Sequence, residues 1–242
     1  MNYPERIVPG EAEAGVDAVH LKRYEFAAPL CAGRRVLDAG CGVGYGAARL
    51  AATAESVVGV DVSDDAIDYA RAHYGAPNLS FAVMDVTALA LENASFDITC
   101  SFETIEHVDD AERAVGELAR ILRDDGVLVV STPQVERTTT SPANPFHRVE
   151  FSRADFEALL ARHFASVELY GQRRLQTRRH RLAQRLDVLG LRRRLAILRR
   201  ASVMLGTTPT ADLTADDIVI SREGIERASE LVAVCRDPRR SQ

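Results

Sequence analysis

A glycine-rich segment, residues 40–46, is the first part of the chain whose composition points to ligand binding. It carries a glycine at every second position and follows the apolar run Arg35–Ala39. Glycine lets the main chain turn tightly and lets a ligand approach it closely, and a helix start offers unpaired N–H groups to an anion. The segment therefore predicts a nucleotide-like ligand. A plain tight turn and the loose dinucleotide pattern Gly42-x-Gly44-x-x-Ala47 are the alternatives.

Three aspartates stand where three predicted strands end, and they narrow the choice of ligand. Asp38 lies beside the glycine-rich segment, Asp61 follows residues 56–60, and Asp85 follows residues 79–84. The carboxyl ends of parallel strands meet at the edge where open α/β sheets bind ligands. There Asp61 could accept both hydroxyls of a ribose, and Asp85 could accept a hydrogen bond from an adenine amino group. Asp38 would repel a diphosphate and attract a sulfonium or ammonium.

The elements that must position these residues alternate along the chain. Between residues 34 and 132 short apolar runs alternate with helical patterns, which is typical of βαβ units and a parallel sheet. Strands are predicted over 35–39, 56–60, 79–84, 96–102, 127–131, 166–170 and 231–235. Helices are predicted over 44–54, 65–73, 109–122 and 152–164, with Ser63 or Asp64 capping the second. Residues 133–150, which contain three prolines, predict a long loop.

Five motifs occur in order within this region: VLDAGCGVGYG, GVDVS, MDVTAL, FDITCSFETIEHV and LRDDGVLVVSTP. In order and spacing they resemble the class I S-adenosylmethionine (SAM)-dependent methyltransferases. The resemblance implies an α/β fold with a Rossmann-like, doubly wound, seven-stranded sheet and a reversed last strand, which LVAVC at 231–235 would supply. It implies a single domain whose parts are a helical lead-in (1–33), a SAM-binding core (34–132), an acceptor-side segment (133–172), a helical insertion (173–215) and a final strand and tail (216–242).

Carried over by position, the resemblance assigns a SAM site. The cofactor-binding residues are Asp38, Gly40, Cys41, Gly42, Asp61, Val62, Asp85 and Val86. Asp38, Gly40 and Gly42 belong to the methionine end. Asp61 belongs to the ribose, Val62 to the adenine ring, and Asp85 and Val86 to the adenine edge. The lead-in resembles helices that close over SAM, so that His20, Arg23 or Tyr24 could reach the methionine carboxylate or the pocket. A helix that only packs against the core is the alternative.

His107 is the favoured catalytic base. It follows the strand predicted over 96–102, whose end faces the methyl group in the resembled fold. Methyl transfer is an in-line displacement in which the protein aligns the acceptor and removes its proton, and imidazole can take a proton near neutral pH. Glu106 could orient His107, raise its basicity or contact the cofactor. A structural role for His107 remains the alternative.

The segment NPFHRVEF, residues 144–151, resembles the acceptor-facing part of sugar and small-metabolite O-methyltransferases. It makes His147 and Glu150 the expected substrate contacts. Together with Glu103 and His107, these two residues could also form a magnesium site, although the spacing alone does not require one.

An arginine-rich stretch follows the acceptor-side segment. Between Arg173 and Arg200 there are eleven arginines against one acidic residue, Asp187, whereas the whole chain carries a net charge of −5. Leucines recur there at helical spacing. The stretch could be a lid or homodimer element that recognises an anionic acceptor, a helix on an acidic membrane surface, an RNA contact or a solvated helical hairpin.

The composition excludes several classes of protein. With 242 residues, 46% hydrophobic and 27% charged, the chain is neither disordered nor fibrous. Its apolar runs are too short for a membrane span, and the N-terminus lacks the signal-peptide pattern. Four widely spaced cysteines disfavour a disulfide framework and a zinc site. We therefore expect a soluble, cytoplasmic protein.

These observations together predict a SAM-dependent O-methyltransferase for a small polar acceptor, such as a sugar or a natural-product intermediate. The alternatives are a methyltransferase for a quinone-like or lipid-linked substrate at a membrane, an RNA-binding methyltransferase, and a nicotinamide dehydrogenase. Methylation of nucleic-acid amino groups is disfavoured, because SFETIEHV lacks the Asn/Asp-Pro-Pro-Tyr/Phe element typical of those enzymes.

Overall fold

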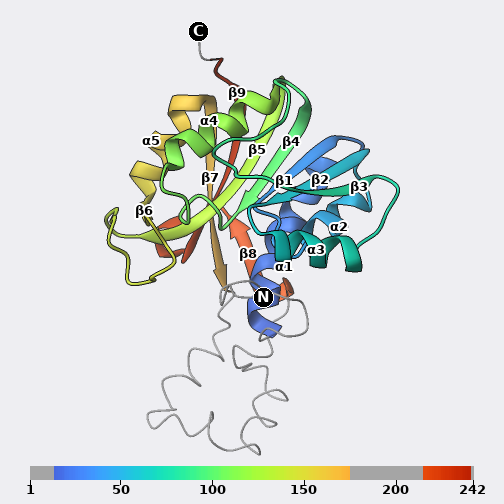
Figure 1. Cartoon of the computed structure of the whole chain (residues 1–242). Coiled ribbons are helices and arrows are strands. Elements are labelled where there is room, and N and C mark those ends of the chain that lie inside the picture. The colour runs from blue at the N-terminus through green and yellow to red at the C-terminus, as the bar shows by residue number, and fades with distance from the viewer. Residues whose placement is uncertain (1–13, 175–214, 241–242) are drawn as a thin grey trace, which may run out of the picture.

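The computed structural model describes residues 14–174 and 215–240, which form a twisted sheet with helices on both faces (Figure 1). The strands are β1 (Arg35–Ala39), β2 (Ser56–Asp61), β3 (Leu79–Val83), β4 (Phe96–Phe102), β5 (Leu122–Val135), β6 (Phe151–Ser152), β7 (Phe164–Arg174), β8 (Ile218–Ser221) and β9 (Glu230–Pro238). The helices are α1 (Ala14–Cys31), α2 (Tyr45–Ala51), α3 (Asp64–His73), α4 (Ala111–Ile121) and α5 (Arg153–His163), with short 3₁₀ turns at η2 (Ala215–Asp217) and η3 (Ile225–Arg227).

The strand order is β3-β2-β1-β4-β5-β9-β7-β8, with β6 paired to β5 beside this path. Strands β1 to β5 are parallel, and β9 runs antiparallel to both of its neighbours, β5 and β7. The expected α/β class, the Rossmann-like doubly wound sheet and the reversed last strand are thus confirmed. The chain order reverses between β1 and β4, which is the point where open α/β sheets bind ligands.

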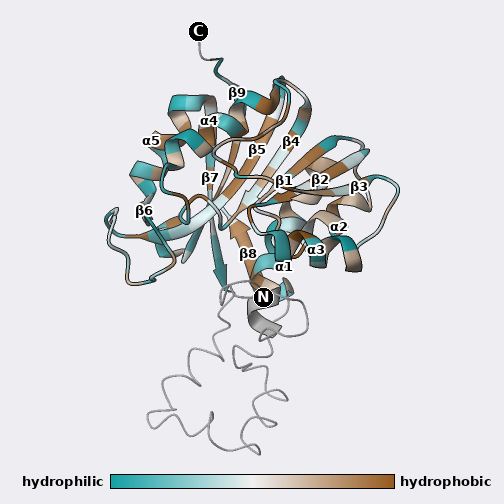
Figure 2. Ribbon diagram, in the orientation of Figure 1, coloured by the Kyte–Doolittle hydropathy of each residue, from teal (hydrophilic) through white to brown (hydrophobic). Residues whose placement is uncertain are grey.

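The core lies in two layers, one on each face of the sheet. Alternate residues of a strand point to opposite faces, so Val36 packs with α1, α2 and α3, whereas Leu37 packs with α4 and α5. Strand β4 is buried along its whole length. Figure 2 shows apolar residues along the central strands and hydrophilic residues on the outer surfaces of the helices.

Side chains cap the helices where the sequence changes from strand to helix. Ser63, Asp110 and Ser152 each accept a hydrogen bond from a main-chain N–H in the first turn of α3, α4 and α5, at 3.4, 2.9 and 3.2 Å. This interaction satisfies one of the unpaired donors at a helix start. Of the two caps proposed for the second predicted helix, Ser63 is the one observed.

The structure corrects several boundaries. The sheet exceeds seven strands, because β8 pairs antiparallel with β7 and β6 adds a short parallel pair with Gln134 and Val135 of β5. Strand β7 extends to Arg174, so Arg173 and Arg174 belong to the sheet and not to the predicted insertion. The rest of that insertion, residues 175–214, lies outside the described residues. No helix in the described ranges is long and apolar enough to cross a membrane.

Candidate cofactor and acceptor site

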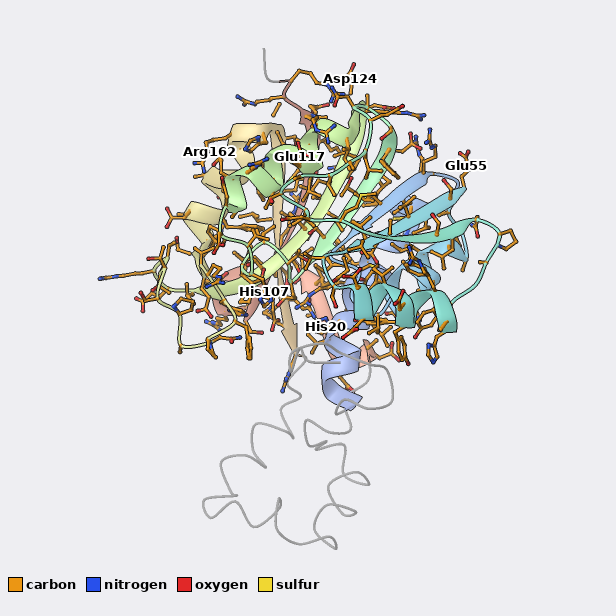
Figure 3. The ribbon with its side chains drawn as sticks, viewed as in Figure 1. His20, Glu55, His107, Glu117, Asp124 and Arg162 are labelled. Carbon is orange, nitrogen blue, oxygen red and sulfur yellow. The ribbon has the colours of Figure 1, made fainter. Side chains whose placement is uncertain are left out.

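A cavity of about 680 Å³ lies at the carboxyl ends of the parallel strands. The predicted site residues that line it are Gly40, Cys41, Gly42, Asp61, Val62, Asp85, Val86, Glu106, His107 and His147. Figure 3 shows the labelled His20 and His107 near one end of the strands, and Glu55, which precedes β2, and Asp124, near the start of β5, at the opposite end. Cofactor-side and acceptor-side residues that are far apart in the chain therefore share one cavity.

The glycine-rich segment is held in place by main-chain hydrogen bonds to β2 and by a close contact with α1. The N–H groups of Gly40 and Cys41 donate to the carbonyl of Val60, at 2.8 and 2.9 Å, which ties the segment to the end of β2. At position 46 a Cβ atom would stand 1.9 Å from the ring of Tyr24. This glycine therefore lets α1 lie directly against the segment that opens α2.

Asp38 and Tyr24 form a buried pair behind the glycine-rich segment. The hydroxyl of Tyr24 lies 3.2 and 3.3 Å from the two carboxylate oxygens of Asp38 and donates to them. A direct contact of Asp38 with the cofactor was expected, but its side chain is 0% exposed and does not line the cavity. Tyr24 lines the cavity in its place. Burial raises the pKa of Asp38 to about 7, because desolvation disfavours the carboxylate.

Asp61 and Asp85 lie in the cavity wall with their orientations fixed. Asp61 accepts hydrogen bonds from the N–H groups of Gly42 and Ser63, at 2.9 and 3.0 Å. Asp85 accepts from the N–H and the hydroxyl of Thr87, at 2.8 and 2.7 Å, through one of its two oxygens. Val62 beside them is 68% exposed, which is unusual for valine and suits a surface on which a flat ring packs. This wall matches the needs of an adenosine.

Glu106 is the buried acid of the acceptor side. Its side chain is 0% exposed, and one carboxyl oxygen accepts from the hydroxyl of Thr132 at 3.2 Å. The other oxygen, Oε1, has no hydrogen-bond partner within the described part of the chain. Burial, and then the charge of Glu103, raise the pKa of Glu106 well above its usual value.

His107 and His147 come together because the loop after β5 folds back over the segment after β4. The N–H groups of Arg148 and Val149 donate to the carbonyl of Glu106, at 2.7 and 3.3 Å. The two imidazole rings consequently lie 4.8 Å apart between centroids and nearly perpendicular, at 85°. The carbonyl of Phe146 lies 3.1 Å from Nδ1 of His107, and since a carbonyl only accepts, the neutral ring carries its lone pair on Nε2.

His147 is fixed from both sides of its ring. Nδ1 lies 2.8 Å from Oε1 of Glu150, and Nε2 lies 2.9 Å from the amide nitrogen of Asn144. The N–H of Phe146 donates to the amide oxygen of Asn144 at 3.0 Å, which sets the amide orientation. His147 lines the cavity and Glu150 does not, so Glu150 acts on the site through His147 and not by the expected contact with substrate.

Of the four residues expected to hold magnesium, His107 and His147 come together in the described part of the chain, and Glu103 and Glu150 do not join them. Glu103 accepts from the hydroxyl of Ser131 at 2.8 Å and lies 3.3 Å from the guanidinium of Arg23, while Glu150 is engaged with His147. The group whose ligand atoms converge consists of Glu106, His107 and His147.

Glu103 and Arg23 make contacts that the sequence did not predict, and Arg23, unlike His20 and Tyr24, does not line the cavity. Glu103 adopts φ 50°, a conformation that costs a residue with a side chain of the order of 1–3 kcal/mol, and Ser131 holds it there. Arg23, 1% exposed, donates to Gln172 at 2.8 Å and so connects α1 to β7. Neither contact has a local sequence signal, because each joins segments far apart in the chain.

Comparison with known proteins supports the same kind of site. Residues 37–130 match a family model described as "Methyltransferase domain". A protein of Mycolicibacterium smegmatis named "Probable S-adenosylmethionine-dependent methyltransferase" is 40% identical over 162 residues, 64% of this chain and 62% of that protein. The "Ubiquinone biosynthesis O-methyltransferase" of Paracidovorax citrulli is 38% identical over 121 residues, 48% of this chain and 50% of that protein.

The chain thus spans between half and two thirds of the length of these two relatives. Among solved structures, a SAM-dependent methyltransferase of Thermotoga maritima covers 92% of this chain and 91% of its own with a TM-score of 0.61. At 19% identity that similarity shows the fold alone, a Rossmann-like α/β sheet. Together these matches show a methyltransferase-domain pattern over residues 37–130 and relatives named as methyltransferases.

Proposed function

We propose that this chain transfers the methyl group of SAM to a hydroxyl group of a small polar acceptor, such as a sugar or a natural-product intermediate. The observation that carries the proposal is that one cavity joins two halves. One half has oriented carboxylates at strand ends, Asp61 and Asp85, and the other has two imidazoles, His107 and His147.

The cofactor half is suited to a cationic nucleoside. Asp61 would accept the ribose hydroxyls, Asp85 would accept the adenine amino group, and Val62 would pack under the ring. Behind the glycine-rich segment Asp38 contributes a carboxyl whose ionised form attracts a sulfonium. A pyrophosphate in the same place would meet that carboxyl as a like charge.

The acceptor half is suited to removing a proton. The methyl carbon leaves the sulfonium, which keeps the electron pair of the C–S bond and becomes a neutral thioether, and the carbon bonds to the acceptor oxygen. The hydroxyl proton passes to Nε2 of His107, whose other nitrogen is oriented by the carbonyl of Phe146. A positioned base of this kind contributes about 10²–10⁴-fold to the rate. His147, held by Glu150, lies beside it as an acceptor contact.

A quinone-like phenol is the second candidate acceptor. It is favoured by the similarity to the ubiquinone biosynthesis O-methyltransferase of Paracidovorax citrulli. A phenol ionises more readily than a sugar hydroxyl, so the two candidates differ in their need for the base. The roles of the arginine-rich stretch in binding RNA, a membrane or a second copy stay predictions.

The test is to incubate the full chain with SAM that carries a labelled methyl group and a panel of sugars, polar natural-product intermediates and hydroxylated quinones. Label in a sugar or natural-product hydroxyl supports the proposal, and label in a quinone supports the second candidate. Label in an amino group or in carbon, or no transfer to any member of the panel by protein that binds SAM, contradicts hydroxyl methylation.

A further inference from the structure

The acceptor half of the cavity contains a compact set of metal-ligating atoms. One atom each from Glu106, His107 and His147 lies within 4.8 Å of the other two, and all three residues line the cavity. They come from two segments, the one after β4 and the loop before β6, which the hydrogen bonds to the Glu106 carbonyl bring together.

The carboxyl of Glu106 supplies a second and independent observation. Its Oε1 is buried in the cavity wall and has no hydrogen-bond partner among the described residues, whereas Oε2 accepts from Thr132. A buried polar oxygen without a partner is unfavourable, and it calls for an explanation such as an ion.

The two imidazoles are held as metal ligands usually are. A ligating histidine normally donates its other ring N–H to a carbonyl or a carboxylate, which fixes the tautomer and directs the lone pair at the metal. His107 has the carbonyl of Phe146 at 3.1 Å from Nδ1, and His147 has the carboxylate of Glu150 at 2.8 Å from Nδ1. Both rings therefore carry the lone pair on Nε2.

We propose that Glu106, His107 and His147 bind a divalent transition-metal ion through one carboxylate oxygen and two Nε2 atoms. Two imidazoles and one carboxylate suit manganese, iron, cobalt or zinc better than magnesium, which prefers oxygen ligands. The amide of Asn144, now 2.9 Å from Nε2 of His147, has to turn away when the ion binds. Three protein ligands leave coordination positions open toward the cavity.

The use of the ion rests on the proposed function, whereas its binding does not. An acceptor hydroxyl oxygen that enters an open position has its pKa lowered by the ion, so its proton passes to solvent at the cavity mouth and the bound alkoxide attacks the methyl carbon. His107 is then a ligand, and its role as the base belongs to the ion-free chain.

The binding test uses the tag-free full chain, stripped with a chelator and titrated with Mn²⁺ alone while electron paramagnetic resonance measures the free ion. Manganese is chosen because it binds the four buried thiols weakly. We expect one ion per chain, and we expect Glu106→Gln and His147→Ala to weaken binding by about 10–100-fold or more. Thermal unfolding followed by circular dichroism shows whether each variant is folded.

The matched control is His163→Ala, because His163 also pairs with a glutamate, Glu112 at 2.6 Å, but lies at the end of α5 and does not line the cavity. It should bind Mn²⁺ like the wild type. Failure of the wild type to bind, or equal binding in wild type, Glu106→Gln and His147→Ala, overturns the metal proposal. Calorimetry with SAM on the same samples keeps the outcomes separate, since a chain that binds SAM but no Mn²⁺ contradicts only the metal site.

Discussion

Two buried carboxyls, Asp38 behind the glycine-rich segment and Glu106 in the cavity wall, differ in their partners. Asp38 has both oxygens near the hydroxyl of Tyr24 and adjoins the cofactor half. Glu106 has one oxygen on Thr132 and lines the acceptor half. Asp38 can therefore interact with the positive charge of a bound cofactor, whereas Glu106 can contact the acceptor or an ion directly.

The raised pKa of Asp38 predicts a pH-dependent stability. The pKa is about 7 in the folded chain and about 4 when unfolded, so between these values the folded chain holds a proton that the unfolded chain releases. The contribution of Asp38 to the free energy of unfolding is therefore favourable below about pH 4 and is lost as the pH rises to about 7. Asparagine does not ionise, so Asp38→Asn removes this loss. Relative to wild type, the free energy of unfolding should rise by up to about 4 kcal/mol at pH 8 but not at pH 4. Urea unfolding of both proteins at the two pH values measures it, and an equal difference at both would contradict the assignment.

The acceptor half makes a separate prediction for His107. Its replacement by alanine should lower turnover by about 10²–10⁴-fold, because the acceptor hydroxyl loses the group that handles its proton. Affinity for SAM, measured by calorimetry, should change little, since His107 stands on the other side of the cavity from Asp61 and Asp85. His163→Ala should keep wild-type turnover, and near-wild-type turnover in His107→Ala removes this residue from the mechanism.

Among the elements, α1 does more than complete the core. Tyr24 of this helix lies on Gly46, where a Cβ atom would be 1.9 Å from its ring, and it carries the hydroxyl that binds Asp38. Tyr24 lines the cavity, so the helix borders the cofactor half, and closure of the lead-in over SAM stays a prediction. Packing against the core accounts for the burial of Ala27, Cys31 and Tyr24, whereas the hydroxyl of Tyr24 also binds Asp38.

Gly46→Ala tests this contact between α1 and the glycine-rich segment. The added methyl group collides with the Tyr24 ring, so we expect a loss of about 1–3 kcal/mol in the free energy of unfolding and weaker SAM binding. Gly75→Ala is the control, because nothing lies within 4 Å of the Cβ it would add. Adding Tyr24→Ala to Gly46→Ala should remove the collision. If Gly46→Ala and Gly75→Ala instead have equal effects, α1 does not constrain the glycine-rich segment.

The sequence alone locates most elements, because their signals are local. The apolar run of β4, the Ser63 cap of α3 and the glycines after β1 each act within a few residues. Strand β8 was not predicted, since Ile218–Ser221 is short and gains its place only by pairing with the edge of β7. The same holds for the site, where the strand-end aspartates were predictable, but the approach of His147 to His107 depends on a loop that returns to the carbonyl of Glu106.

At the scale of the whole molecule, the sheet divides the cavity into two chemical environments. The strand ends before the topological reversal, at β2 and β3, supply carboxylates in fixed orientations, and the segment after β4 supplies imidazole and a buried acid. The division explains how one cavity can hold a cationic nucleoside and activate a neutral hydroxyl. It also explains why Asp85, far from His107 in this arrangement, should affect cofactor binding and not the chemical step.

The central claim is that the acidic strand ends select a cationic thioether nucleoside over a pyrophosphate, and calorimetry with SAM and with NAD on the same full chain tests it most directly. We predict one molecule of SAM bound per chain, no measurable binding of NAD, and SAM binding weakened by Asp61→Asn, whose carboxylate is placed for the ribose. Binding of NAD, or SAM affinity that is unchanged in Asp61→Asn, would contradict the account.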